Sequence, residues 1–431
     1  MALAEKISRE TAKLERYMKE KGLPMPAFDV DAADDFPKLP ADIQNCRLEI
    51  IHATKQLRDL TIGPRESVRW GVWEFLDVLA LQVIYNYELA KLVPLDKPIS
   101  LTDLQKLTPL DPVNLARVLR TAMTNHIFTE PSPNLIAHTA ASRLLATDEE
   151  LAAWVGFNVE DIFPASNGVL PALQTHPEAT SLTRAGYQFA FDTVDVEPMF
   201  ATFGRDAKRS RRMGQAMTSL TGGEGYEVAY FVDSCDLGDV DARGGTFVDV
   251  GGSHGVVCVS LARRWQGIKF IVQDLPKTVA SAPDPVCEDA QVAGRVQFQA
   301  HDFFTPQDVA ADVYYFRWIM HNYSTPYAVD ILKNLVPVLK PGARIIINDH
   351  CLRDPGQENP WDEKIMRRMD MVMLTLLNAQ ERTEEEFREL FRLADEGFVF
   401  KGVTRAKGCR MSIVEAAVDD QTQDTPAPVS E

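Results

Sequence analysis

The sequence predicts an α/β fold in which a doubly wound parallel sheet follows a helical N-terminal region. From about Thr218 to Ala417, β-forming runs alternate with helical runs, as a parallel sheet with crossover helices requires. Before that point, amphipathic helical stretches dominate. The chain has 431 residues, of which 45% are hydrophobic, so it can form more than one domain and bury a sizeable core.

The first elements are predicted to be helices. Residues 1–21 are charged and helical in composition, 22–40 form a break rich in proline and aspartate, and 42–60 carry apolar residues at helical spacing. Neither helix holds a candidate catalytic residue.

A helix–turn–helix and a hairpin are expected next. After an apolar helix over 75–89, Ser100 can cap a second helix, and Pro112 opens a third. Short strands are expected near 127–130 and 135–138. This is a winged-helix pattern, but DNA binding is disfavoured because the hairpin has no Lys or Arg.

Aromatic residues gather between 154 and 203. Such side chains could wall a pocket for a flat acceptor, although for any single one of them core packing is the better interpretation. A basic run follows, and we expect it to form one solvated helix face rather than an anion site: Arg205, Lys208, Arg209, Arg211 and Arg212.

A strand, a glycine-rich turn and a helix open the parallel region. The strand 246–250 runs into Gly251-Gly252-Ser253-His254-Gly255, and 256–264 is predicted to be helical. Glycines let backbone N–H groups and the helix N-terminus approach a ligand closely. The next strand, 269–273, leads to Asp274, which can accept hydrogen bonds from ribose hydroxyls. This spacing fits a dinucleotide fold and a methyltransferase fold equally, and the absence of G-x-G-x-x-G distinguishes them.

Further strands are expected near 296–299, 312–317 and 343–349, with an antiparallel pair near 398–404 and 409–414. His321 follows the fourth strand of this series. An imidazole, whose ordinary pKa is about 6.5, is well matched to take a proton from a hydroxyl near neutral pH. A single histidine without further context is more often structural.

Six sequence blocks, in order, resemble the class I S-adenosylmethionine-dependent O-methyltransferases of the plant caffeic-acid type and their fungal secondary-metabolite relatives. They are FVDVGGSHG, QDLPKTV, the acid of HDFF, FRWIMHNYS, LKPGARIIINDHCL and ERTEEEFRELFRLADEGF. The resemblance implies a Rossmann-like class I methyltransferase domain behind an α-helical winged-helix dimerisation domain. It also implies S-adenosyl-L-methionine as cofactor, S-adenosyl-L-homocysteine as product, and a homodimer.

The same resemblance assigns roles to residues. His321 corresponds to the general base, and Asp349 and Glu381 to the acids held against it, with Asp349 one methylene shorter than the plant Glu. Asn322 replaces the Asp that plant members carry after the histidine. Cofactor contacts are expected from Asp249, Gly251, Gly252, Gly255, Asp274, Leu275, Asp302, Phe303 and Arg317, the last replacing a plant Lys. Acceptor contacts are expected from Phe163, Met199, Phe203, Trp318, Met320, Met369, Met373 and Asn378, with packing as the alternative for each.

The predicted function is methyl transfer to a phenol, enol or N-hydroxyl group of a fungal secondary metabolite. The alternative is an enzyme of the pericyclase or dehydratase kind on the same fold, which binds the cofactor without methyl transfer. Positioning can supply about 7–11 kcal/mol and a general base about 3–5 kcal/mol, so a chain could lose methyl transfer and keep a shaped chamber. The presence of His321, Asp349 and Glu381 together favours methyl transfer.

Composition limits the other function classes. The net charge of −17 disfavours nucleic acid and anionic membranes as partners, and six cysteines without C-x-x-C spacing indicate no metal site. No run of about eighteen apolar residues exists and charges come early, so we expect a soluble, cytoplasmic protein. The predicted segments are an arm (1–65), a winged-helix domain (66–150), a helical linker (151–217), the methyltransferase domain (218–417) and a disordered tail (418–431).

Overall fold

The computed structural model describes residues 2–419, which divide into two compact units. The first holds the chain up to Asn167 together with Phe200–Leu220 and Asn359–Trp361. The second holds Gly168–Met199, Thr221–Glu358 and the chain from Asp362. The stretch 151–217, predicted to be one linker, is thus shared between the two units. The predicted tail, apart from Val418 and Asp419, lies outside the described residues.

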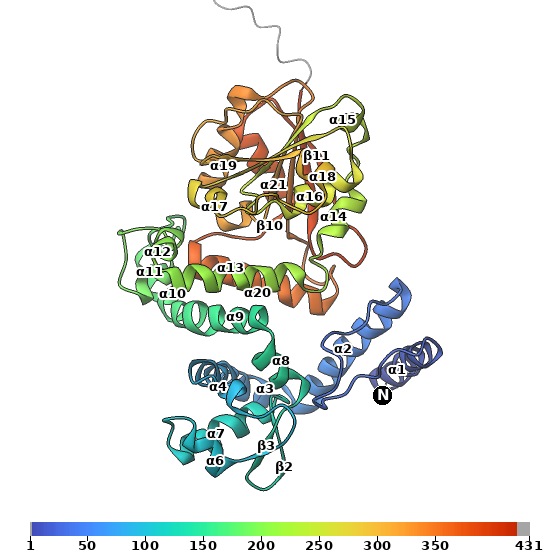
Figure 1. The fold of residues 1–431 in the computed structure, drawn as a ribbon, viewed down its shortest axis with the longest axis vertical. Helices are drawn as coiled ribbons and strands as arrows, with labels where there is room; N and C mark the ends of the chain where they lie inside the picture. The colour runs from blue at the N-terminus through green and yellow to red at the C-terminus, as the bar shows by residue number, and fades with distance from the viewer. Residues whose placement is uncertain (1, 420–431) are drawn as a thin grey trace, which may run out of the picture. The chain divides into compact units, whose positions relative to one another are not determined.

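The first unit is mainly helical (Figure 1). Its helices are α1 (Ala2–Glu20), α2 (Ala41–Ile62), α3 (Pro64–Gly71), α4 (Phe75–Asn86), α5 (Leu89–Leu92), α6 (Leu101–Lys106), α7 (Pro112–Met123), α8 (Ala140–Thr147), α9 (Glu149–Phe157) and the π-helix η1 (Asn158–Ile162). It also holds α12 (Met199–Arg205) except Met199, and α13 (Ala207–Gly222) up to Leu220. Helix α10 (Phe163–Thr175) begins in this unit and ends in the second.

The predicted cap at Ser100 and the predicted helix start at Pro112 are confirmed. The Ser100 side chain accepts from the Asp103 amide at the start of α6, and Asp111 accepts from the Val113 amide at the start of α7, where Pro112 needs no partner. The hairpin consists of β2 (Thr129–Ser132) and β3 (Leu135–Ala137). A third strand, β1 (Ile99–Ser100), pairs with β3 and was not predicted, because two residues carry no alternation signal.

One prediction in this unit is wrong. Arg212, expected on a solvated helix face, is only 8% exposed, and its guanidinium pairs with the fully buried Asp161 at 2.5 Å. Arg209 lies 3.5 Å from the other carboxylate oxygen of Asp161. The π-helical turn 158–162 contains Asp161, and a carboxylate without solvent needs a cation beside it.

The second unit contains the predicted sheet. Its strands are β4 (Thr246–Val250), β5 (Lys269–Asp274), β6 (Val296–Ala300), β7 (Val313–Arg317), β8 (Arg344–Asp349), β11 (Phe398–Thr404) and β12 (Ser412–Val418), in the spatial order β11-β12-β8-β7-β4-β5-β6. Strands β8, β7, β4, β5 and β6 run parallel, and β12 pairs antiparallel with β8 and β11. A short parallel pair joins β9 (Cys351–Leu352) to β10 (Arg382–Thr383).

Helices cover this sheet (Figure 1). They are α14 (Val228–Ser234), α15 (Gly238–Ala242), α16 (Val256–Arg264), α17 (Pro276–Ala280), α18 (Ala290–Ala293), α19 (Thr325–Lys333) and α21 (Glu384–Ala394); α11 (Gly186–Ala190), α20 (Pro360–Leu377), η2 (Met320–Asn322) and η3 (Val336–Val338) complete the unit. Consecutive residues Tyr314, Tyr315 and Phe316 are all fully buried, so both faces of β7 are covered.

Within this sheet, the strand positions agree with the sequence prediction except at the last strand; in the first unit, β2 begins at Thr129 rather than near 127. β12 begins at Ser412 rather than near 409, because Gly408 takes a positive φ of 86° in the turn that precedes it. Among residues 2–419, no helix combines the length and apolar character needed to cross a bilayer.

The strand order places the candidate site. From β4 the chain proceeds to β5 and β6 on one side, and β7 and β8 lie on the other side. The carboxyl ends of β4 and β7 therefore meet at the point where the order reverses, which is where open parallel sheets bind ligands. The glycine turn follows β4, and His321 follows β7.

Candidate active site

The turn after β4 has the backbone geometry that its glycines predict. Gly251 and Gly255 have φ values of 77° and 75°, and the Gly251 amide donates to the Gln273 carbonyl at 2.8 Å, which ties the turn to β5. Gly255 begins α16 without a side-chain cap. The first amides of α16 are therefore placed to bind polar groups of a ligand.

The buried Asp249 side chain packs against the glycine turn. It is 2% exposed, its carboxylate lies 3.7 Å from the Cys258 thiol, and burial raises its pKa to about 7. A Cβ atom on Gly252 would lie only 2.5 Å from the Asp249 carboxyl carbon. Gly252 is therefore required because the backbone passes directly over this carboxyl group.

The acids after β5 and β6 fit the ribose and base of a nucleoside. Asp274 is half-buried and accepts from the Ser253 amide at 2.9 Å and the Leu275 amide at 2.8 Å, and each carboxylate oxygen has a second lone pair for a hydroxyl. Beside it, the Leu275 side chain is 53% exposed. Asp302 is exposed. The Phe303 ring packs edge-on against the Tyr323 ring, with 5.7 Å between the ring centroids. One half-buried and one exposed carboxylate, with apolar side chains beside them at the carboxyl edge of the sheet, suit S-adenosylmethionine.

Arg317 has other partners in the structure. Its guanidinium donates to the Asn348 side chain and, at 2.6 Å, to the Tyr226 carbonyl. These bonds tie β7 to β8 and to the loop before α14. A contact of Arg317 with the cofactor stays a prediction.

His321 lies on η2, 6% exposed, directly after β7. Its Nδ1 is 3.0 Å from Oε1 of Glu381, whereas Asp349 accepts from its backbone amide at 3.1 Å. The two acids thus hold different parts of the residue. Glu381 orients the ring, and the shorter Asp349 fixes the main chain.

His321 and Glu381 each change the pKa of the other. Burial opposes the ionised form of Glu381, but the imidazoles of His350 and His321 lower its pKa to about 2. Burial likewise opposes the charged form of His321, yet the Glu381 carboxylate raises the pKa of His321 overall. An ionised Glu381 only accepts, so Nδ1 of His321 carries a proton and Nε2 keeps a lone pair. His321 can therefore act as a base through Nε2.

Three further contacts hold this arrangement. The Glu381 amide donates to Asp370 of α20 at 2.9 Å. Arg382, 1% exposed, donates to the Met320 carbonyl at 2.7 Å and the Tyr323 carbonyl at 2.6 Å. One guanidinium thus bonds to residues at both ends of the segment that carries His321. No local pattern of residues indicates this role of Arg382.

A second histidine was missed by the sequence analysis. His350 is fully buried, its Nδ1 lies 3.2 Å from the same Oε1 of Glu381, and its Nε2 lies 3.2 Å from the Tyr226 hydroxyl. The centroid of the Trp318 ring lies 4.9 Å from that of the His321 ring and 5.1 Å from that of the His350 ring. His350 directly follows Asp349 at a strand end, which could have pointed to it, but nothing local identifies Tyr226.

The candidate acceptor residues are distributed over both units. Met199, Met320, Met373 and Asn378 are buried in the second unit, where Trp318 and Met369 are half-buried. Phe163 and Phe203 belong to the first unit, where Phe203 packs edge-on against Phe157 at 6.1 Å. The Asn378 side chain donates to the Ser181 carbonyl at 2.9 Å. Acceptor binding by this set stays a prediction.

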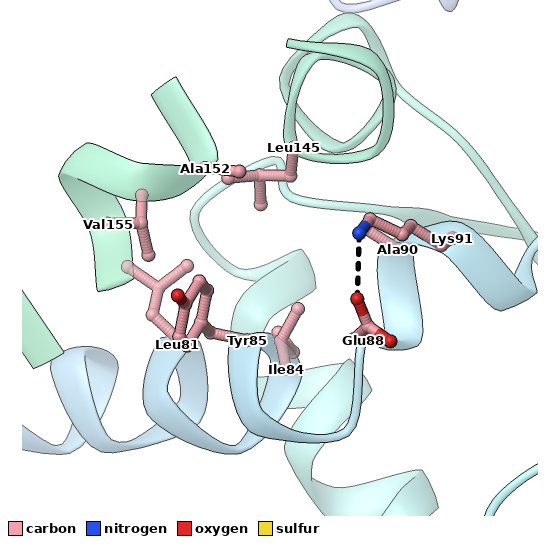
Figure 2. A pocket seen from close by; sticks show the side chains of 9 residues that line it. All are labelled: Leu81, Ile84, Tyr85, Glu88, Ala90, Lys91, Leu145, Ala152 and Val155. Atoms are coloured by element: carbon pink, nitrogen blue, oxygen red, sulfur yellow. Dashed lines mark hydrogen bonds and ion pairs between the residues drawn. The ribbon is translucent and has the colours of Figure 1, made fainter. Parts of the chain in front are cut away.

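A separate pocket lies within the first unit (Figure 2). Its volume of about 50 Å³ compares with roughly 150 Å³ for a cavity that takes up benzene. It is therefore too small for an aromatic acceptor. Its lining residues are Leu81, Ile84, Tyr85, Glu88, Ala90, Lys91, Leu145, Ala152 and Val155. Within residues 2–419, no group of three or more His, Cys, Asp or Glu side chains is arranged to hold a metal ion.

Comparison with known proteins places the chain in a family. Residues 179–399 match the O-methyltransferase domain family. The chain is 60% identical over 421 residues to the chlorophenol O-methyltransferase of Trichoderma longibrachiatum, covering 97% of this chain and 90% of that protein.

Solved structures share the fold at lower identity. The crystal structure of OxaC matches with a TM-score of 0.76 at 21% identity, over 97% of this chain and 99% of OxaC. A structure described as a pericyclic reaction enzyme matches with a TM-score of 0.71 at 19% identity, over 96% and 99% of the two chains. These likenesses establish the fold but do not decide the chemistry. On the family match and the extensive identity, the chain belongs to the class I S-adenosylmethionine-dependent O-methyltransferases.

Proposed function

We propose that this chain transfers the methyl group of S-adenosylmethionine to the hydroxyl of a small phenol, with His321 as general base. The observation that carries the proposal is the buried contact of 3.0 Å between His321 Nδ1 and Glu381 Oε1. It lies at the carboxyl end of β7, next to the strand that leads into the glycine turn.

The chain's own residues perform the proton transfer. When bound, S-adenosylmethionine supplies an electrophilic methyl group on a positively charged sulfur. His321 Nε2 takes the hydroxyl proton, and the Glu381 carboxylate stabilises the imidazolium that forms. Asp349 and Arg382 keep the backbone of His321 in place meanwhile. A base of this kind contributes about 10²–10⁴ in rate.

Cofactor binding is proposed for the residues at the sheet edge. The amides of the 251–255 turn and of the start of α16 would bind polar groups, and Asp274 would accept from the ribose hydroxyls. Leu275, Asp302 and Phe303 would surround the adenine. All of these positions lie in the second unit.

The acceptor class rests on chemistry and on the relative's name. A relative at 60% identity is named for chlorophenol, and a phenol presents the single hydroxyl that one imidazole can deprotonate. Chlorine makes a phenol more acidic, so the base matters less for heavily chlorinated phenols. The pericyclic alternative has only a shared fold in its favour, whereas the His321–Glu381 pair is intact.

Labelled S-adenosylmethionine and a series of phenols of increasing chlorination test this proposal. We expect labelled ethers from the wild type and a loss of about 10²–10⁴ in kcat for His321→Ala with the least acidic phenol. The loss should shrink as the phenol becomes more acidic. His138→Ala, which removes a buried imidazole from the first unit, is the matched control. Rearranged but unlabelled product, or an equal rate for His321→Ala, would contradict the proposal.

We also propose that the protein is a homodimer. The end of α2, α3 and the start of α4 expose a series of large apolar side chains, a pattern typical of protein interfaces. They are Leu60, Val68, Trp70, Val72, Trp73 and Phe75. Sedimentation velocity should give a dimer for the wild type and a monomer for the variant Val68→Asp with Trp73→Asp. A monomeric wild type at micromolar concentration would refute this.

A cytoplasmic location is proposed as well. All six cysteines are free, as expected in a reducing compartment. A fluorescent fusion that accumulated in the secretory pathway would contradict this proposal.

A further inference from the structure

Glu381 lies between two imidazoles. Its Oε1 is 3.0 Å from Nδ1 of His321 and 3.2 Å from Nδ1 of His350. Its other oxygen, Oε2, is buried without a hydrogen-bond partner among the described residues, and His350 Nδ1 meets Oε1 as a close polar contact rather than as a well-aligned hydrogen bond. One carboxylate oxygen therefore faces both histidines, and only His321 follows β7, where the acceptor is expected.

The hydrogen positions follow from the partners. Because the ionised Glu381 can only accept, the Nδ1 atom of His350 that faces it must carry a proton. In the neutral ring, Nε2 of His350 then accepts, and the Tyr226 hydroxyl, 3.2 Å away, can donate to it. Tyr226 is 4% exposed, and burial raises its pKa, so its hydroxyl keeps the proton. Close polar contacts thus link the side chains of Tyr226, His350, Glu381 and His321 in that order.

Resting on the function proposed above, we propose that His350 is a positioning residue that shares the Glu381 carboxylate with His321. With its Nδ1 only 3.2 Å from Oε1, the His350 ring limits how strongly that carboxylate holds a proton on His321. The Tyr226 hydroxyl fixes the His350 ring through Nε2, so Nδ1 stays beside the Glu381 carboxylate. His350 contacts no reacting atom and acts only through Glu381.

Other charged groups lie near these four side chains, but none of those described here links Tyr226 to Glu381 as His350 does. Asp349 precedes His350 on β8 and binds the His321 amide. Arg410, from the loop between β11 and β12, lies 5.5 Å from the Tyr226 ring centroid and pairs with Asp362 at 2.8 Å. His350 is therefore the one described side chain that joins Tyr226 to Glu381.

The proposal predicts that removal of His350 moves the protonation midpoint of His321 to higher pH. Removal of the His350 donor leaves Glu381 to His321 alone, so the protonated form of His321 becomes more stable. The acidic limb of the kcat/KM profile should move up by about one pH unit in His350→Phe, which corresponds to about 1.4 kcal/mol, because the Glu381 carboxylate then loses the polar group 3.2 Å from its Oε1. The loss of rate should be confined to the acidic side, about tenfold below the limb.

Two readouts test this on the full chain with bound S-adenosylhomocysteine. NMR titration of ¹⁵N-labelled histidine rings gives the midpoint of His321 directly, with its signals identified by their loss in His321→Ala. The pH profile of methyl transfer gives the same midpoint kinetically. If no phenol is methylated, the proposed function fails, and the NMR midpoint still tests the role of His350.

Three variants separate tuning from simple packing. His350→Asn keeps a donor near Nδ1 and should restore most of the wild-type midpoint. Tyr226→Phe keeps the ring and removes only the hydroxyl, so it should shift the midpoint upward by less, and it tests the proposal even if His350→Phe does not fold. His138→Phe removes another buried histidine with both nitrogens bonded, and it should lower stability without moving the midpoint. A midpoint of His321 that is unchanged or lower in both His350→Phe and Tyr226→Phe would overturn the proposal.

Discussion

Glu381→Gln is the substitution that probes the candidate dyad most selectively. It keeps the shape of the side chain and removes its charge, 3.0 Å from Nδ1 of His321. At an effective dielectric constant of about 20, two unit charges at this separation attract by roughly 5 kcal/mol. Gln can still accept a hydrogen bond, so we expect part of this energy to be lost, about 3 kcal/mol, which corresponds to about two pH units.

The direction in which the acidic limb should move follows from the raised pKa of His321. The Glu381 carboxylate raises the pKa of His321, and the base must be neutral to act, so wild-type activity rises with pH through that raised value. In Glu381→Gln the acidic limb should move to lower pH, opposite to the shift proposed for His350→Phe. The plateau of kcat should fall by about 10²–10⁴, because the imidazolium loses its counter-charge.

The assay is formation of S-adenosylhomocysteine with a weakly acidic phenol across pH, with cofactor affinity measured by calorimetry. Glu389→Gln is the matched control, since Glu389 is exposed on α21 and pairs with Arg392 at 2.6 Å. Its profile should match the wild type. An acidic limb in Glu381→Gln at the wild-type position, with an unchanged plateau, would refute the coupling of Glu381 to His321.

Three other substitutions test separate parts of the account. Gly252→Ala should weaken S-adenosylhomocysteine binding at least tenfold and lower the free energy of unfolding by about 1–3 kcal/mol, because the new Cβ meets the Asp249 carboxyl carbon at 2.5 Å. Asp274→Ala should weaken the same binding by about 10–150-fold in calorimetry, since a hydrogen bond to a charged group contributes about 1.5–3 kcal/mol. Arg212→Met should lower the free energy of unfolding in urea by about 3–5 kcal/mol, because it leaves Asp161 buried without its closest cation.

Each of these has its own control. Gly214→Ala in α13, where no atom lies within 4 Å of the new Cβ, should not weaken binding or lower stability. Asp233→Ala removes an exposed partner of Arg264 and should leave cofactor affinity unchanged. Asp161→Leu with Arg212→Met should recover most of the stability that Arg212→Met loses. Wild-type affinity in Gly252→Ala or Asp274→Ala, or wild-type stability in Arg212→Met, would count against the corresponding contact.

Local signals in the sequence predicted the parts of the fold that depend on neighbours along the chain. The glycine turn, the cap at Ser100, the helix start at Pro112 and the strands β4 to β8 each follow from residue types a few positions apart. The strand order then brings the ends of β4 and β7 together. The approximate location of the site was therefore predictable.

Contacts between distant residues were not predictable in this way. His350 meets Tyr226 across 124 positions, and Arg212 meets Asp161 across 51. Asp349 and Glu381 were expected to play similar parts, but the shorter side chain binds the His321 amide instead of the ring. Such differences depend on side-chain reach and on which groups packing isolates from water, and neither is encoded in local spacing.

The central claim is that His321 Nε2 faces the oxygen that receives the methyl group. The most direct measurement is a crystal structure of the chain with S-adenosylhomocysteine and a phenol acceptor. We expect the phenolic oxygen within about 2.6–3.2 Å of His321 Nε2, with the nucleoside on the 251–255 turn and its ribose on Asp274. An acceptor oxygen beyond hydrogen-bond reach of that ring, or a nucleoside bound away from the turn, would contradict the account.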